Sequence, residues 1–251
     1  MNRSLLIIIG LLCALLTAAG IIYYTPLNVA RRQLHDKRSS MRCRAMTELC
    51  KLDDKKSIPE IIQLIKNEDP IVRSYAAGTL GVLNAKETIP EITKLLQDNN
   101  HGVRWSAVVA LGELGAKEAI PEIIKLLLDE DMWVRLFTVR ILGDLDAKEA
   151  IPGITKLLNN DEYSVQCESL IALYRLDAKG SIPKFIEFLQ NDLAYLRSLT
   201  VRVLGKMGAK ELIPEIKKML KDKDEQVLWS AEEALRQLGV PEAEIEQAKS
   251  K

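Results

Sequence analysis

Residues 116–145 decide the fold, and they read AKEAIPEIIKLLLDEDMWVRLFTVRILGDL. The first half places apolar residues at helical spacing after Pro121, and proline is tolerated in the first turn of a helix because its missing N–H is not needed there. A polar break at residues 129–131 precedes a second helical pattern that begins with Val134-Arg135. The stretch therefore predicts a hairpin of two short helices.

The same pattern recurs along the chain with a period of 31 residues. The Ile-Pro pair that opens the first helix begins at Ile58, Ile89, Ile120, Ile151, Ile182 and Ile213. The second helix of every copy ends at a residue type that tolerates the left-handed backbone conformation of a C-terminal cap. These residues are Asp53, Asn84, Gly115, Asp146, Asp177, Gly208 and Gly239. We therefore expect a left-handed helix cap at all seven positions.

This period divides the chain into three segments. Residues 1–24 precede the repeats, residues 25–240 hold one degenerate and six regular helix pairs, and residues 241–251 form a carboxyl-terminal cap. Each helix pair can bury its apolar face only against its neighbours, as in solenoid proteins. The expected fold is therefore all-α, a right-handed α-solenoid of helical hairpins preceded by one transmembrane helix.

The expected transmembrane helix rests on the run from Leu5 to Ile22, which carries no charge. About 20 residues of helix span the roughly 30 Å hydrocarbon core of a bilayer. Basic residues are concentrated after this run, at Arg31, Arg32, Lys37, Arg38, Arg42 and Arg44. Because basic flanks stay on the cytoplasmic side, we expect a single-pass membrane protein with a cytoplasmic repeat domain. The alternative is export after cleavage of a signal peptide near Thr17-Ala18-Ala19.

The repeat motif resembles the HEAT-like repeat of the phycobilisome-lyase type: Ala-Lys-Glu-x-Ile-Pro-Glu-Ile, then Leu-Leu, Asp, Val-Arg and Ala-Leu-Gly-x-Leu-Gly. The resemblance covers nearly all of residues 25–240 and implies an interaction scaffold that binds other proteins. Deoxyhypusine hydroxylases share the architecture but carry His-Glu pairs for two irons, whereas here His35 precedes Asp36 and His101 precedes Gly102. An activity on a client protein, like that of the phycobilin lyases, stays open as the alternative.

Composition and motifs indicate no catalysis. The 35 basic and 35 acidic residues balance, so the chain lacks the net basic charge typical of a nucleic-acid binder. Neither a phosphate-binding P-loop nor a Gly-x-Ser-x-Gly elbow occurs. With two histidines and no Cys-x-x-Cys pair in the sequence, we expect no enzyme: no catalytic residues, no metal and no cofactor.

Partner binding is expected on the second helix of each pair, at positions opposite its buried stripe. These positions do not follow the period, and they carry aromatic residues and arginines, which are enriched in protein interfaces. The resemblance implies that second helices line a concave groove for a protein or an extended peptide. The predicted groove residues are Tyr75, Trp133, Phe137, Arg140, Arg175, Tyr195, Leu199 and Arg202. The alternative is that Trp133 or Phe137 belongs to the core. The arginine of each Val-Arg pair follows the period and is interpreted as a brace between repeats.

Overall fold

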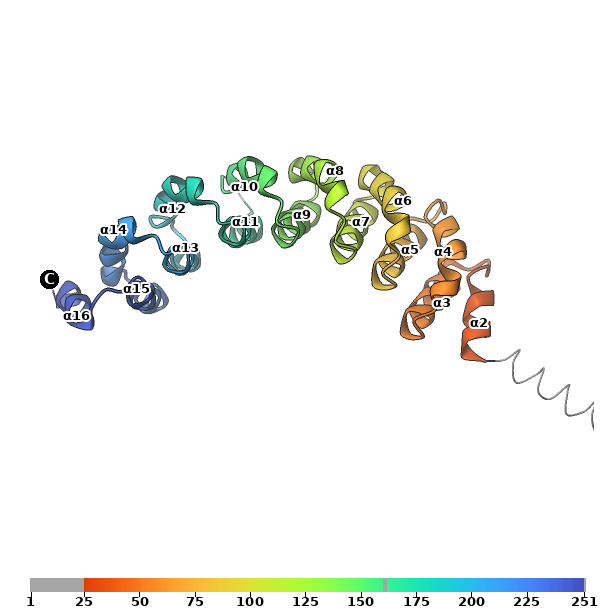
Figure 1. The fold of residues 1–251 in the computed structure, drawn as a ribbon, viewed down its shortest axis with the longest axis horizontal. Helices are drawn as coiled ribbons and strands as arrows, with labels where there is room; N and C mark the ends of the chain where they lie inside the picture. Colours follow the sequence, from red (N-terminus) through yellow and green to blue (C-terminus); the bar gives the residue numbers. More distant parts are fainter. Residues whose placement is uncertain (1–24, 160–161, 251) are drawn as a thin grey trace, which may run out of the picture. The chain divides into compact units, whose positions relative to one another are not determined.

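The computed structural model describes residues 25–159 and 162–250, and every regular element in these ranges is a helix (Figure 1). The transmembrane segment predicted within residues 1–24 lies outside the described residues. Within the described ranges, no helix combines the length and the apolar character that a membrane crossing requires. The all-α class predicted from the sequence is confirmed for the described part of the chain.

Helix pairs occur where the Ile-Pro period predicts them. The first helices are α4 (Ile58–Leu64), α6 (Ile89–Lys94), α8 (Ile120–Lys125), α10 (Ile151–Leu157), α12 (Ile182–Phe188) and α14 (Ile213–Lys218). The second helices are α5 (Pro70–Val82), α7 (His101–Glu113), α9 (Met132–Asp144), α11 (Tyr163–Arg175), α13 (Ala194–Lys206) and α15 (Glu225–Gln237). The degenerate pair is α2 (Pro26–Gln33) and α3 (Ser39–Lys51), and α16 (Glu242–Ser250) follows the last repeat.

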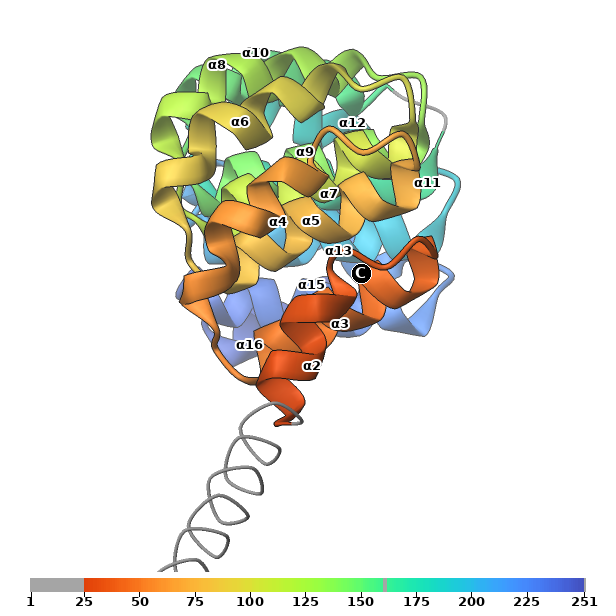
Figure 2. The same cartoon turned by 90° about the vertical axis from the view of Figure 1, so that its right-hand side faces the viewer.

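The chain divides into two compact units, one up to Ala119 and one from Ile120. In the first unit, α4 and α6 lie in one layer and α3, α5 and α7 in a second layer (Figure 1 and Figure 2). In the second unit, α8, α10, α12 and α14 form one layer and α9, α11, α13 and α15 the other. Within each unit the second helices therefore share a face, the second-helix face, on which side chains of successive repeats are neighbours.

Local sequence signals determine where the helices begin and end. Four second helices start at an N-cap whose side-chain oxygen accepts a backbone N–H, and these residues are Asp69, Asn100, Asp131 and Asp224. After the second helices, φ is positive at all seven predicted cap positions, from 47° at Asp53 to 85° at Gly239. The prediction of left-handed caps is confirmed, and it explains why only Asp, Asn and Gly occupy this position.

The core is a buried stripe along each second helix. In α7 it consists of Val103, Ala107, Ala110, Leu111 and Leu114, each at most 2% exposed. A small side chain recurs at the second position of the stripe and is fully buried in every copy: Ala45, Ala76, Ala107, Thr138, Ser169, Thr200 and Ala231. Because protein interiors are close-packed, small residues at this position let the flanking helices approach closely.

The close contacts between neighbouring second helices recur every two repeats, at twice the 31-residue period. The same contact between a glycine and an alanine recurs in three pairs: Gly81 and Ala110, Gly143 and Ala172, and Gly205 and Ala234. A Cβ added at the three glycines would lie 3.2, 3.3 and 2.8 Å from the alanine Cβ. In α11, which contributes the alanine of the contact with α9, Tyr174 occupies the position that is equivalent to the glycine. The glycine is therefore needed in α5, α9 and α13, and it is dispensable in α11.

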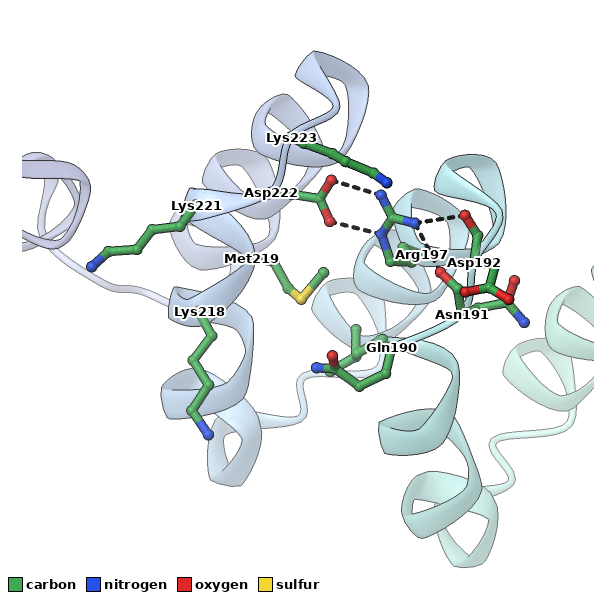
Figure 3. A pocket seen from close by; sticks show the side chains of 10 residues that line it. Gln190, Asn191, Asp192, Arg197, Lys218, Met219, Lys221, Asp222 and Lys223 are labelled. Carbon is green, nitrogen blue, oxygen red and sulfur yellow. Dashed lines mark hydrogen bonds and ion pairs between the residues drawn. The ribbon is translucent and has the colours of Figure 1, made fainter.

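The periodic arginines brace neighbouring repeats, as predicted. Arg197 of α13 donates to both carboxylate oxygens of Asp222, at 2.7 Å each, and to the backbone carbonyls of Asn191 and Asp192 (Figure 3). Arg73 binds Asp98 in the same way in the first unit, at 2.8 Å. Each arginine thus joins its own preceding loop to the loop of the next repeat, and this maintains the spacing of the stack.

Candidate functional site

The residues predicted to contact a partner lie on second helices, but they differ in exposure. Tyr75 on α5, Trp133 on α9 and Tyr195 on α13 are 47%, 56% and 45% exposed. The prediction is wrong for Leu199, which is only 5% exposed. Its side chain is wholly apolar, so it gains more from packing between helices than from facing water. Tyr75, at the equivalent position of α5, keeps part of its ring in solvent.

On α9 and α11, ion pairs between the two helices close the second-helix face. Arg140 donates to the two carboxylate oxygens of Glu168, at 3.2 and 2.9 Å, and its guanidinium lies 4.9 Å from the centre of the Phe137 ring. Arg175 donates to Asp144 at 2.8 Å. The charges of the predicted contacts Arg140 and Arg175 are therefore balanced within the chain, and Phe137 is half-buried next to Arg140.

On α3, α5 and α7, the second-helix face opens into an apolar hollow of about 490 Å³, named here the α5 hollow. Tyr75, Val82 and Trp105 are exposed side chains of its lining. Gly78 also lines it, and a Cβ added at this glycine would meet no atom within 4 Å. Two periods later the equivalent residue is Arg140. The lack of a side chain at Gly78 therefore keeps the hollow open.

A second hollow, of about 410 Å³, adjoins the α5 hollow and shares Thr47 and Tyr75 with it. It is lined by Ile71, an isoleucine that is 60% exposed, and by Arg44. Large apolar side chains that face water in one continuous area are uncommon on a solvated helix surface. Together the two hollows make an extended apolar surface across α3 and α5, with a basic residue in its lining.

The exposed residue Glu113 places a carboxylate near Cys50, which lines the α5 hollow. Its Oε2 lies against α5, only 2.5 Å from where a Cβ of residue 81 would stand. Burial raises the pKa of Glu113, and burial together with the nearby Glu113 charge raises the pKa of the Cys50 thiol in the hollow. Among residues 25–159 and 162–250, none forms a hydrogen bond or an ion pair with the Glu113 side chain. This arrangement suits an apolar segment that also carries a basic group.

On α13 and α15, the second-helix face is hollowed again, but its chemistry is different. A hollow of about 390 Å³ is lined by Arg202, Lys206, Trp229, Glu233 and Gln237. In the part of the chain that the structure describes, Arg202 and Lys206 have no ion-pair or hydrogen-bond partner. Equivalent positions of the second helices thus form an apolar surface on α5 and α7, a charge-balanced one on α9 and α11, and a cationic one on α13 and α15.

Sequence reasoning missed Trp105 and Trp229. This position is not among the predicted groove residues, and other copies hold residues such as Ser74 and Cys167 there. In the structure Trp105 is 39% and Trp229 60% exposed, and each lines one of the hollows. The available signal was size: a tryptophan at a position that accepts serine indicates open space around it.

The described residues provide no candidate metal centre. Within residues 25–159 and 162–250, no three His, Cys, Asp or Glu side chains are placed to share an ion. His35 lies 3.1 Å from Glu60 on the surface, and His101 is the first residue of α7. What the structure brings together on the second helices is a set of aromatic, aliphatic and charged side chains, which suits recognition of another molecule.

Two layers of short helices, repeated at a fixed period and braced between repeats, define the α-solenoid class of protein. The chain belongs to the HEAT repeat family, whose sequence profile matches residues 68–135, 120–194 and 182–245. The resemblance drawn from the repeat motif is thereby confirmed. Among curated proteins, none matches the chain by sequence.

Solved structures share the fold at low sequence identity. The complex of CpcE and CpcF of phycocyanin lyase from Nostoc is 23% identical, with 90% of this chain and 94% of that chain covered and a TM-score of 0.55. The Escherichia coli protein YibA is 19% identical, with 86% and 82% covered and a TM-score of 0.66. An engineered protein is 19% identical, with 92% and 72% covered and a TM-score of 0.56. These similarities establish the architecture and leave the function to the surface of this chain.

Proposed function

We propose that this chain is a protein-binding module that holds an apolar segment of a partner protein in the α5 hollow. The observation that carries the proposal is the open space at Gly78, with Tyr75, Val82 and Trp105 exposed in the same hollow. Grouped aromatic and aliphatic side chains in a concave surface are typical of binding sites. Membership of the HEAT repeat family agrees with this function, because solenoids present extended surfaces to their ligands.

The hollow fits the apolar side of a helix or of an extended peptide. A side chain of the size of leucine or phenylalanine would enter above Gly78 and contact Tyr75 and Trp105. Full burial of one such side chain contributes roughly 1.5–3 kcal/mol. Near Cys50, Glu113 would pair with a lysine or arginine of the same segment, in a charge-assisted hydrogen bond. The proposed partner segment therefore combines an apolar residue with a nearby basic residue.

Site-specific photocrosslinking tests the proposal in cells that produce the chain. A photoreactive amino acid in place of Val82 should crosslink to the partner, and mass spectrometry should place the crosslink on an apolar segment with a neighbouring basic residue. The same amino acid in place of Lys94, an exposed residue of the first helix α6, is the matched control. Crosslinks to the same segment from Lys94 and none from Val82 would contradict the assignment to the α5 hollow.

Two substitutions of Gly78 make the test sharper. Gly78→Arg fills the hollow with the side chain that Arg140 and Arg202 place at equivalent positions, and it should abolish the crosslink from position 82. Gly78→Ala adds a Cβ in open space and should preserve the crosslink. Circular dichroism melts verify that both variants fold. Equal crosslinking of the two variants would show that nothing inserts above Gly78.

The second part of the proposal is that residues 1–24 attach the solenoid to a membrane, with the repeats on the cytoplasmic side. Its support is the uncharged run from Leu5 to Ile22 and the excess of basic residues that begins at Arg31. An uncleaved chain that stays in membranes after alkaline carbonate extraction is the expected result. A mature chain that lacks roughly the first nineteen residues would instead indicate signal-peptide cleavage and export.

A second candidate function is an activity on a client protein like that of a phycobilin lyase. The similarity to the CpcE and CpcF structure favours it, although 23% identity establishes the fold alone. A visible absorption band on the purified chain would support this candidate. A colourless chain that still binds its partner through the α5 hollow would support the scaffold.

A further inference from the structure

We infer that the hollow on α13 and α15 binds an acidic segment of a partner protein through Arg202, Lys206 and Trp229. The inference rests on the proposed protein-binding function, but it concerns a separate surface with its own chemistry. α13 and α15 lie in the second unit together with α9 and α11, and their residues are equivalent to those of α9 and α11 two periods earlier. The charges on α9 and α11 can therefore be compared with those on α13 and α15, position by position.

On α9 and α11, the two arginines at positions equivalent to the hollow each have an acidic partner on the facing helix. Arg140 of α9 pairs with Glu168 of α11, and Arg175 of α11 pairs with Asp144 of α9. The N–O distances are 2.9 and 2.8 Å. Two positive and two negative side chains leave this surface without net charge, and the arginines are engaged.

On α13 and α15, the partner of the first arginine is missing. Arg202 takes the position of Arg140, but Ser230 stands where Glu168 would be. Ser230 is fully buried and shares a hydrogen bond of 2.9 Å with Ser198. It carries no charge, so it does not neutralise the guanidinium. Arg202 is half-buried and has no ion-pair partner within residues 25–159 and 162–250.

The second ion pair of α9 and α11 is also missing on α13 and α15, and its replacement again removes a negative charge. Lys206 replaces Asp144, and Gln237 replaces Arg175. The Gln237 amide donates to Glu233 at 2.9 Å, and Glu233 also lines the hollow. One carboxylate against two cations leaves a net charge of +1 from these three side chains. The hollow thus lacks the carboxylates that close the equivalent surface on α9 and α11.

Trp229 gives this cationic hollow an apolar wall. It is exposed, and in the earlier pair Cys167 takes its position. A guanidinium such as that of Arg202 donates two parallel hydrogen bonds to one carboxylate. An exposed indole beside it stacks on an aromatic side chain or packs on an aliphatic one. The surface therefore fits a protein segment in which Asp or Glu stands next to an aromatic or aliphatic residue.

A random peptide library displayed on phage tests this inference with the full chain in detergent. The native chain should select peptides with Asp or Glu beside an aromatic or aliphatic residue, and the double variant Arg202→Gln/Lys206→Gln should lose this selection. Fluorescence anisotropy with the best peptide should show binding at least about tenfold weaker for the double variant. The affinity for the native chain should fall as salt is added, because the hollow is open to solvent.

Gln237→Glu is a nearly isosteric variant that restores a carboxylate opposite Lys206, and it should also weaken binding of the acidic peptide. Gly78→Arg in the first unit should leave that binding unchanged. This difference separates a failure of the inference from a failure of the α5 hollow. Selection of the same acidic peptides by the native chain and the double variant, or no acidic selection at all, would overturn the inference. Competition by inorganic phosphate, but not by acetate at equal ionic strength, would also overturn it by indicating a phosphate site.

Discussion

Arg197 of α13 and Asp222 of the next repeat form an ion pair with two parallel hydrogen bonds, each 2.7 Å long. Both side chains are 8% exposed. The same guanidinium donates to the carbonyl oxygens of Asn191 and Asp192, so one side chain ties two loops to a helix. In α15, Leu228 replaces the arginine. Leu228 has no polar group in its side chain, so it cannot form this brace.

Loss of this brace should destabilise the fold. Asp222→Asn removes the charged acceptor, and the free energy of unfolding should fall by about 1.5–3 kcal/mol, the range for hydrogen bonds to charged groups. Urea denaturation followed by circular dichroism measures the change. Arg236→Gln is the control, because Arg236 pairs with Glu232 and Glu242 on the exposed surface, where ion pairs contribute little. Equal losses in the two variants would argue against a special role of the brace.

The contribution of the brace should depend on pH. Hydrogen bonds from Arg197 lower the pKa of Asp222 below its ordinary value of 3.8. A carboxyl group whose pKa is lower in the folded state stabilises the fold fully above its unfolded pKa, and this stabilisation is lost as the pH falls through the folded value. The stability difference between the native chain and Asp222→Asn should thus be constant above about pH 5 and shrink at more acidic pH. A difference that changes between about pH 6 and 8 would point to another group.

The double repeat predicts opposite effects for two glycine substitutions. Gly205→Ala would place a Cβ 2.8 Å from the Cβ and 2.9 Å from the Cα of Ala234, and such overpacking costs about 1–3 kcal/mol. Gly78→Ala meets no atom within 4 Å and should stabilise its helix by about 0.5–1 kcal/mol. Thermal melts of both variants distinguish the two positions. Two variants with the same melting temperature would contradict the close approach of α13 and α15.

The left-handed caps predict a stabilising substitution. Asp177 has a φ of 49°, a conformation that is strained for residues with a side chain and free for glycine. Asp177→Gly should therefore raise the free energy of unfolding by up to about 1 kcal/mol. Asp177→Ala is the control and should lower it, since alanine tolerates this conformation less well than aspartate. Chemical denaturation that ranks alanine above glycine would mean that the cap relaxes in solution.

Core and surface of the second helices should separate in stability measurements. Leu111 is fully buried, so Leu111→Ala should cost about 2–5 kcal/mol through lost contacts and a cavity. Trp133 is 56% exposed, so Trp133→Ser should cost little stability. Thermal melts of the two variants measure this difference. A loss of stability as large for Trp133→Ser would assign this tryptophan to the core.

The stack of helix pairs follows from rules that act within a few residues. The first helices begin with Pro121 or an equivalent proline in their first turn. The second helices end at a cap residue with positive φ, which is Asp, Asn or Gly at all seven positions. The periodic arginine could also be interpreted from the sequence alone, because its recurrence indicated a structural role. Solvent exposure on the second helices was predicted less well. Tyr75, Trp133 and Tyr195 are exposed as their position opposite the buried stripe predicts, whereas Leu199 is buried.

The amino-acid sequence by itself determined the repeat, the helix boundaries and the caps, because each depends on hydrogen bonds and backbone angles inside one turn or one loop. Only the tertiary structure decided which surface residues are available. Arg140 and Arg202 are equivalent in the sequence pattern, but Glu168 neutralises the first, whereas Ser230 leaves the second without an ion-pair partner among the described residues. That outcome depends on side chains of the facing helix and on how closely the glycine–alanine contacts bring the helices together. A periodic sequence does not specify this distance, since it results from packing between residues that are about one repeat apart.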